Sequence, residues 1–253
     1  MQKIILMLIT MLSFSTASFS NTPGDTNRID NAGKKIGIWR EKIGTSDYYG
    51  NYAADKKEGL WIGYHPNGII SNIEEYKNGK KNGYSIYIDK SGSYYQKDQY
   101  VNDTLNGLSV SYYSGSKPKS EIEYKMGVLN GVKKIYYSDG KMQESGVYKN
   151  NVRDGITKWF DSEGKVSVEY SYKNGLLEGN LKTYYSNGNI NSEVKAVNNL
   201  QEGPYTEYFE KGKVKIEGKY VHDKKEGVWK EYNEDGKVIK TETYKNGELK
   251  NRS

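Results

Sequence analysis

The side chains best suited to acid–base chemistry near neutral pH are histidines, and this sequence contains only His65 and His222. The two occupy different positions of a repeating pattern in units far apart, so a linear array does not bring them together. A Ser–His–Asp site needs a histidine within hydrogen-bond reach of both partners. Cysteine is absent, which excludes thiol nucleophiles, thiolate ligands and disulfides. We interpret both histidines as turn or surface residues.

Carboxylates are numerous, but they follow a period. A polar residue precedes each of a series of glycines, and it is an acid in some units and asparagine in others: Glu58, Asn82, Asn106, Asn130, Asp154, Glu178, Glu202 and Glu226. General acid–base catalysis needs individually tuned carboxylates, whereas an Asn/Glu column is typical of a polar turn. No GxxxxGK[ST] phosphate loop occurs. The sequence therefore predicts a non-enzymatic protein without a metal or cofactor.

The glycines reveal the organisation that holds these side chains. Eight of them follow one another at steps of 24 residues, and Gly37 stands 22 residues before the first: Gly59, Gly83, Gly107, Gly131, Gly155, Gly179, Gly203 and Gly227. Such a period is typical of a tandem repeat protein. We predict nine units, at 37–58, 59–82, 83–106, 107–130, 131–154, 155–178, 179–202, 203–226 and 227–250. A linker over 21–36 and a tail over 251–253 complete the mature chain.

Positions within a unit are counted from its opening glycine. Tyrosine recurs at +5 and +17, as in Tyr136 and Tyr148, and a mostly apolar column stands at +11. We expect strands over about +1 to +6 and +11 to +17, with +11 and +17 on one face because their parity is equal. Pairs such as Asn78-Gly79 after the second strand favour type I′ hairpin turns. The predicted fold is all-β: one elongated antiparallel sheet, a meander of about 18 strands built from 24-residue hairpins.

The first 20 residues differ from the rest. Lys3 precedes an apolar run from Ile4 to Phe14, and small residues offer cleavage points after Ala17 or Ser20. This arrangement predicts a secretory signal peptide over 1–20. Cleavage leaves a formal net charge of +5, one below the +6 of the whole chain. The charge is spread along the chain, which argues against a nucleic-acid partner, and we expect a periplasmic, cell-surface or secreted protein.

Strings such as EGLWIGYHPNG, NGVKKIYYSDGK and EGVWKEYNEDGK, each followed by a tyrosine and a turn like YKNG, resemble bacterial MORN-repeat variants. The similarity covers about 37–250. Proteins of this kind are often described as YwqK-family antitoxins, and MORN repeats elsewhere are linked with protein–protein contacts and membrane phospholipids. The resemblance implies a repeat fold and a binding role.

Aromatic and apolar residues at +4 and +6 are the predicted binding residues. If the +5, +11 and +17 positions form the packed face, alternation directs these to the other face. The candidates are Tyr87, Tyr113, Ile135, Tyr137, Trp159, Tyr185 and Phe209. A sheet that needs aromatic side chains on both faces is the alternative. We expect a binding or scaffold surface for a protein, envelope or host component. A toxin-neutralising role, or binding of anionic lipid or glycan, is the alternative.

Overall fold

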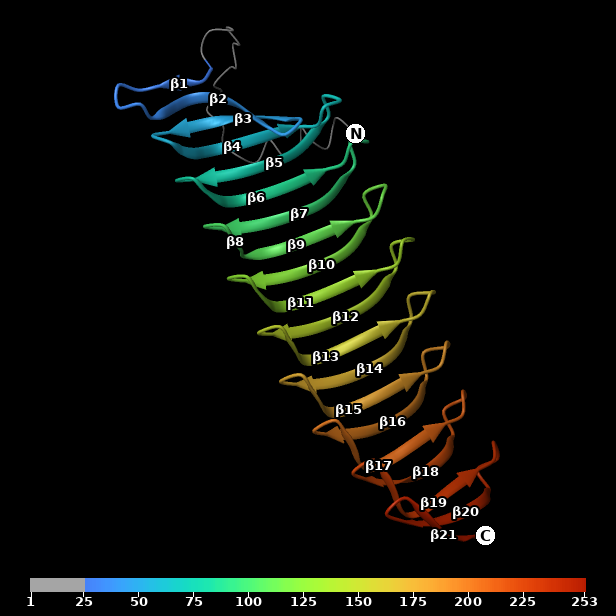
Figure 1. Cartoon of the computed structure of the whole chain (residues 1–253). Helices are drawn as coiled ribbons and strands as arrows, with labels where there is room; N and C mark the ends of the chain where they lie inside the picture. Colours follow the sequence, from blue (N-terminus) through green and yellow to red (C-terminus); the bar gives the residue numbers. More distant parts are fainter. Residues whose placement is uncertain (1–25) are drawn as a thin grey trace.

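The computed structural model describes residues 26–253 as one antiparallel sheet of 21 strands, extended along a single axis (Figure 1). Successive strands pair with their neighbours in the chain, as predicted for a meander. The strands are β1 (Arg28–Ile29), β2 (Lys35–Ile43), β3 (Ser46–Ala53), β4 (Lys56–Tyr64), β5 (Ile70–Lys77), β6 (Lys80–Ile88), β7 (Tyr94–Val101), β8 (Thr104–Leu105), β9 (Gly107–Tyr112), β10 (Pro118–Lys125), β11 (Val128–Tyr136), β12 (Met142–Lys149), β13 (Val152–Phe160), β14 (Val166–Lys173), β15 (Leu176–Tyr184), β16 (Ile190–Val197), β17 (Leu200–Tyr208), β18 (Val214–Val221), β19 (Lys224–Tyr232), β20 (Val238–Lys245) and β21 (Glu248–Arg252).

The strands from β2 to β20 supply the two strands per unit that the period predicts, with β8 and β9 as one interrupted strand. β1 lies within the predicted linker, yet it pairs with β2 through Arg28 and Ile36. The predicted signal peptide over 1–20 lies outside the described residues. Among residues 26–253, no helix has the length and apolarity that crossing a membrane requires.

The first strand of most units begins three residues before the opening glycine, and not after it as predicted. Around Gly83, for example, Glu74 pairs with Ser85 and the next pair is Tyr76 with Lys81. The extra residues form a β-bulge, and Gly83 has a φ of 124° there, which side chains other than glycine rarely adopt. The periodic glycine therefore bends a strand that continues through it.

The predicted type I′ turns are present, and Met126-Gly127 and His222-Asp223 take the same conformation in their units. Both central residues have positive φ, at 54° and 82° in Asn78-Gly79 and at 49° and 79° in Met126-Gly127. His222 also takes this conformation, with a φ of 48°. The first unit is two residues shorter because Gly44 and Thr45 alone connect the paired residues Ile43 and Ser46.

Hydrogen bonds link each type I′ turn to the unit before it. The Asp103 amide donates to the Lys81 carbonyl at 2.9 Å, and the Asp103 carboxylate accepts the Lys81 amide at 2.7 Å. The polar residue before each opening glycine also takes part: Glu58 Oε2 accepts the Asn78 amide at 2.8 Å. Equivalent bonds join Asn106 with Met126, Asp154 with Asn174, Glu178 with Asn198, Glu202 with His222, and Glu226 with Asn246. The periodic carboxylates are turn partners.

Candidate interaction surfaces

The two faces of the sheet carry different side chains. The ladder face is formed by positions +2, +4, +13, +15 and +17, and it holds most of the buried residues, with Trp61 at 0% exposure and Trp229 at 4%. Its rings contact one another between units: Tyr52 meets Trp61 edge-on at 5.0 Å, and Tyr220 meets Trp229 in the same way. Cations cover the rings, as where Lys57 Nζ lies 3.9 Å from the Trp61 centroid. This face is the core of the sheet.

The opposite surface is the stripe face, formed by positions +1, +3, +5, +14, +16 and +18, and by the residue three places before each opening glycine, which pairs with +18. Lysine at +3 and glutamate at +14 form cross-strand ion pairs here, as between Lys158 and Glu169 at 2.9 Å. The +5 tyrosines join them: the Tyr208 hydroxyl donates to Glu193 at 2.7 Å, and the Tyr232 hydroxyl to Glu217 at 2.6 Å. The +3 lysines and +14 glutamates of the stripe face therefore neutralise one another.

This arrangement corrects the predicted grouping of +5, +11 and +17. The Tyr94 ring at +11 meets the Tyr112 ring at +5 at 4.7 Å, whereas the +17 tyrosines lie on the ladder face. The register shifts between +11 and +13 in each long hairpin, for example opposite Ile135 and Tyr136. The extra residue reverses the parity, so +11 and +17 end on opposite faces.

The candidates at +4 lie on the ladder face. Trp159 meets the Tyr170 ring at 5.6 Å and is covered by the Arg153 guanidinium. The Tyr87 hydroxyl accepts a hydrogen bond from Lys81 Nζ at 3.0 Å. Ile135 is half-buried and pairs with Ser120 and Glu144. These three side chains belong to the ladder of the core.

The candidates at +6 open the longer turns, at the strand ends opposite the type I′ turns. Three of them donate a hydroxyl hydrogen bond to a backbone carbonyl of the next unit: Tyr113 to Tyr136, Tyr137 to Phe160, and Tyr185 to Tyr208. Phe209 occupies the same turn position without a hydroxyl. The structure thus gives the tyrosines a structural contact, and partner binding by the +4 and +6 residues stays a prediction.

The two histidines lie in turns at opposite ends of the strands. His65 opens a longer turn, where its Nε2 lies 2.8 Å from the Ile88 carbonyl oxygen, and His222 lies in a type I′ turn. Within residues 26–253, no group of three or more histidine, aspartate or glutamate side chains could hold a metal ion.

An exposed apolar column on the stripe face was not among the predicted sites. Position +1 is apolar in seven of the nine units, and most of these side chains are exposed, with Ile156 at 46% and Val228 at 52%. The column is Ile38, Leu60, Tyr84, Leu108, Val132, Ile156 and Val228, with Asn180 and Pro204 in the other two units. It was readable from the period, because seven of the nine units carry an apolar side chain directly after the opening glycine.

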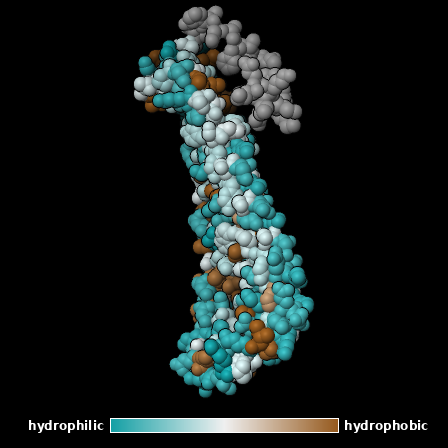
Figure 2. Space-filling view, turned by 90° about the vertical axis from the view of Figure 1, so that its right-hand side faces the viewer, coloured by the Kyte–Doolittle hydropathy of each residue, from teal (hydrophilic) through white to brown (hydrophobic). Residues whose placement is uncertain are grey.

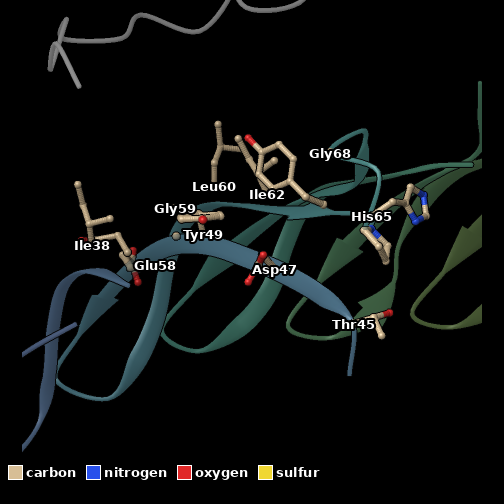
Figure 3. Close-up of a pocket in the computed structure, with 14 residues that line it drawn as sticks. Ile38, Thr45, Asp47, Tyr49, Glu58, Gly59, Leu60, Ile62, His65 and Gly68 are labelled. Carbon is tan, nitrogen blue, oxygen red and sulfur yellow. The ribbon is translucent and has the colours of Figure 1, made fainter. Parts of the chain in front are cut away.

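The stripe face is hollowed at its N-terminal end. A cavity of about 1000 Å³ is lined by residues of β2, β3, β4 and the following turn, among them Ile38, Tyr49, Leu60 and Ile62. Figure 3 shows Leu60 and Ile62 extending from β4 to the same side. The side of the molecule that Figure 2 shows is mostly hydrophilic, with apolar groups along its length. The apolar column is therefore continuous with a groove at one end.

Comparison with known proteins supports the repeat assignment. The sequence profile of the MORN repeat variant matches residues 57–78, 105–126, 129–150, 153–174, 177–198, 201–222 and 225–246, more than half of the chain. The units opened by Gly37 and Gly83 lie outside these matches except for their last two residues, but they fold in the same way. None of the curated proteins matches the chain. Among solved structures, a porin-like protein from Bacteroides uniformis is similar at 8% identity and a TM-score of 0.14, covering 83% of this chain and 91% of that one.

Proposed function

Because the chain belongs to the MORN repeat variant family, we propose that it is a non-enzymatic binding protein whose stripe face recognises a protein partner outside the cytoplasm. The exposed apolar +1 column carries the proposal. Exposed apolar side chains that recur along one face mark interaction sites, since a solvated sheet face gains nothing from them. The ladder face buries its large rings within the sheet and offers fewer of them to a partner.

The repeat architecture supports a partner of considerable length. Each unit contributes an equivalent surface element, and neighbouring units are two strands apart, about 9.6 Å along the axis. Arrays of this kind bind through many similar contacts spread over an extended surface. A partner that spans several units gains from each contact, whereas a small ligand meets only one unit.

Action outside the cytoplasm follows from the predicted signal peptide over residues 1–20. Expression of the full chain with its leader, followed by cell fractionation and N-terminal sequencing, tests it. We expect the mature chain in the extracytoplasmic fraction, beginning at Ser18 or Asn21. A full-length chain that retains Met1 in the cytoplasm would remove this part of the proposal.

Site-specific photocrosslinking in cells tests the recognition surface. Benzoylphenylalanine replaces Ile156 on the stripe face in one variant and Glu163, in an exposed turn at the sheet edge, in the control. We expect a crosslinked protein of defined mass from position 156 alone, and mass spectrometry identifies it. A toxin recovered in this way would establish the neutralising role. Equal crosslinking from both positions, or from position 163 alone, would contradict the stripe face as the recognition surface.

A further inference from the structure

The middle of the stripe face carries six exposed aliphatic side chains near the type I′ turns. They come from β12, β13, β15, β16 and β17, and their exposed fractions lie between 38% and 46%. We call this group the central patch: Val147, Val152, Ile156, Leu176, Val197 and Leu200. Val197 and Leu200 pair directly across neighbouring strands. Gly155 lies beside Val147, so this valine has no Cβ from that neighbour to cover it.

Four exposed lysines border the central patch. Lys149 pairs with Val152, and Lys173 pairs with Leu176, so each lysine leaves its strand beside an exposed aliphatic residue. Lys195 and Lys219 lie at +16 in the next two units, opposite Asn180 and Pro204. No described residue forms an ion pair with any of these four, although sixteen ion pairs occur within residues 26–253.

The carboxylates near the patch already have partners. Glu169 and Glu193, at +14, form ion pairs with Lys158 and Lys182. Asp154 and Glu178 accept backbone amides of the type I′ turns. Glu202 and Glu226 lie opposite Lys195 and Lys219 in the strand register and likewise accept turn amides. The central patch therefore combines apolar area with four lysines that form no ion pair within the described residues, which is complementary to apolar side chains flanked by carboxylates.

The geometry also limits the form of the partner. The patch lies on a face of the sheet, where the backbone groups are already paired, so a partner cannot add a strand and must bind through side chains. Lys149 and Lys173 are one unit apart, about 9.6 Å along the axis at two strand spacings. Carboxylates seven residues apart on one side of an α-helix are separated by about 10.5 Å. A helix along the sheet axis thus places acids at nearly the spacing of the lysines.

We propose that the central patch and its four lysines dock an acidic amphipathic helix of a partner protein. This inference rests on the proposed function and adds the chemistry of the partner. The aliphatic side chains receive the apolar side of the helix, and the lysines bind its flanking carboxylates. The span from β12 to β18 is six strand spacings, about 29 Å, which corresponds to about 20 helical residues.

A phage-displayed library of random 20-residue peptides, selected on the mature protein, tests the proposal without a known partner. We expect the enriched peptides to carry Glu or Asp at helical spacing beside an apolar stripe. Synthetic copies of the enriched peptides should show a stronger helical circular dichroism signal when they are bound. Their affinity for the mature protein should fall when the salt concentration is raised. The charge-reversal variant K149E/K173E/K195E/K219E should lose at least tenfold in affinity for them. The matched control K34E/K80E/K90E/K237E reverses four exposed lysines outside the patch and should lose less than twofold.

Other outcomes separate this inference from the proposed function. Peptides that depend on Ile156, Leu176 and Leu200 but not on the four lysines would overturn the acidic helix and leave the stripe face as a binding surface. Peptides insensitive to both groups of substitutions would overturn both proposals. Vesicles of phosphatidylglycerol are the second probe, and lysine-dependent binding to them without any enriched peptide would assign the patch to a membrane and overturn the helix. Circular dichroism of each variant confirms that its fold is intact.

Discussion

The indole of Trp229 lies against Gly218 of the preceding unit, in the space that a Cβ on residue 218 would occupy. The same relationship joins Trp61 with Gly50 near the other end of the sheet. Two other units place a larger side chain at +15 against a small residue at +2 of the next unit, as with Glu74 and Ser85 or Asp98 and Ser109. At Gly218 and Trp229, neighbouring units therefore share one volume on the ladder face.

Replacing Gly218 with valine should destabilise the protein by about 3 kcal/mol, because overpacking of a well-filled site costs about 1–3 kcal/mol. The double variant G218V/W229Y recreates the pair Val194 and Tyr205 found one unit earlier. Chemical denaturation of the wild type, both single variants and the double variant measures the four free energies of unfolding. The double variant should recover more than half of the stability that G218V loses. Additive losses would argue against shared volume.

Met126 should be replaceable by asparagine with a gain in stability. Its φ of 49° is the left-handed conformation, which costs most non-glycine residues about 1–2 kcal/mol and suits asparagine better. M126N should raise the free energy of unfolding by about 1 kcal/mol. The reverse change N150M, in an equivalent turn with a φ of 50°, should lower it by a similar amount. Thermal melts of M126N, N150M and the wild type test this prediction. Melting temperatures equal to that of the wild type would contradict it.

Removing the hydroxyl of Tyr185 tests the link between longer turns. This hydroxyl donates to the Tyr208 carbonyl at 2.6 Å, so Y185F should cost about 1 kcal/mol of stability. Tyr184 is the matched control, because the adjacent tyrosine has no hydroxyl hydrogen bond within the described chain, and Y184F should leave stability unchanged. If both variants melt alike, the hydroxyl contact contributes nothing measurable.

Alkaline pH should weaken the ladder of tyrosines. Burial raises the pKa of Tyr100 and of Tyr205 to about 12, against about 10 in an unfolded chain. The folded state holds these protons while the unfolded state releases them, so their contribution is complete below pH 10 and is lost as pH rises toward 12. Absorbance of tyrosinate at 295 nm, followed in native and denatured protein, should show part of the native tyrosines titrating late. Coincident titration curves would contradict burial of these hydroxyls.

Period and turn chemistry were sufficient to predict the meander and the type I′ turns. Asn78-Gly79 favours that turn whatever surrounds it, because the preference is local. The face of the sheet that each repeat position occupies was not predictable in this way. Counting odd and even positions assumes a strand without a β-bulge. Each long hairpin has a register shift between +11 and +13, so Tyr94 meets Tyr112 while Tyr220 lies on the other face.

The predicted binding residues show the same limit. Strand alternation predicts Tyr137 and Tyr185 as exposed aromatic residues, but their hydroxyls donate to carbonyls 23 residues ahead, a contact that depends on how units stack. The apolar +1 column was visible in the sequence as Ile38, Leu60 and Ile156, yet its exposure depends on which face holds the buried rings. The hydroxyl contacts of these tyrosines and the exposure of the +1 column both depend on how neighbouring units pack, and not on local sequence propensity.

The central claim is that the stripe face recognises the partner. It is tested most directly by the affinity of the crosslinked partner for a variant whose exposed aliphatic side chains on the stripe face are replaced by serine. Isothermal titration compares the mature wild-type protein with I156S/L176S/L200S, whose three sites are exposed and therefore contribute little to folding. The account predicts at least tenfold weaker binding by the variant with a melting temperature within a few degrees of wild type. Unchanged affinity in a folded variant would show that the stripe face does not recognise the partner.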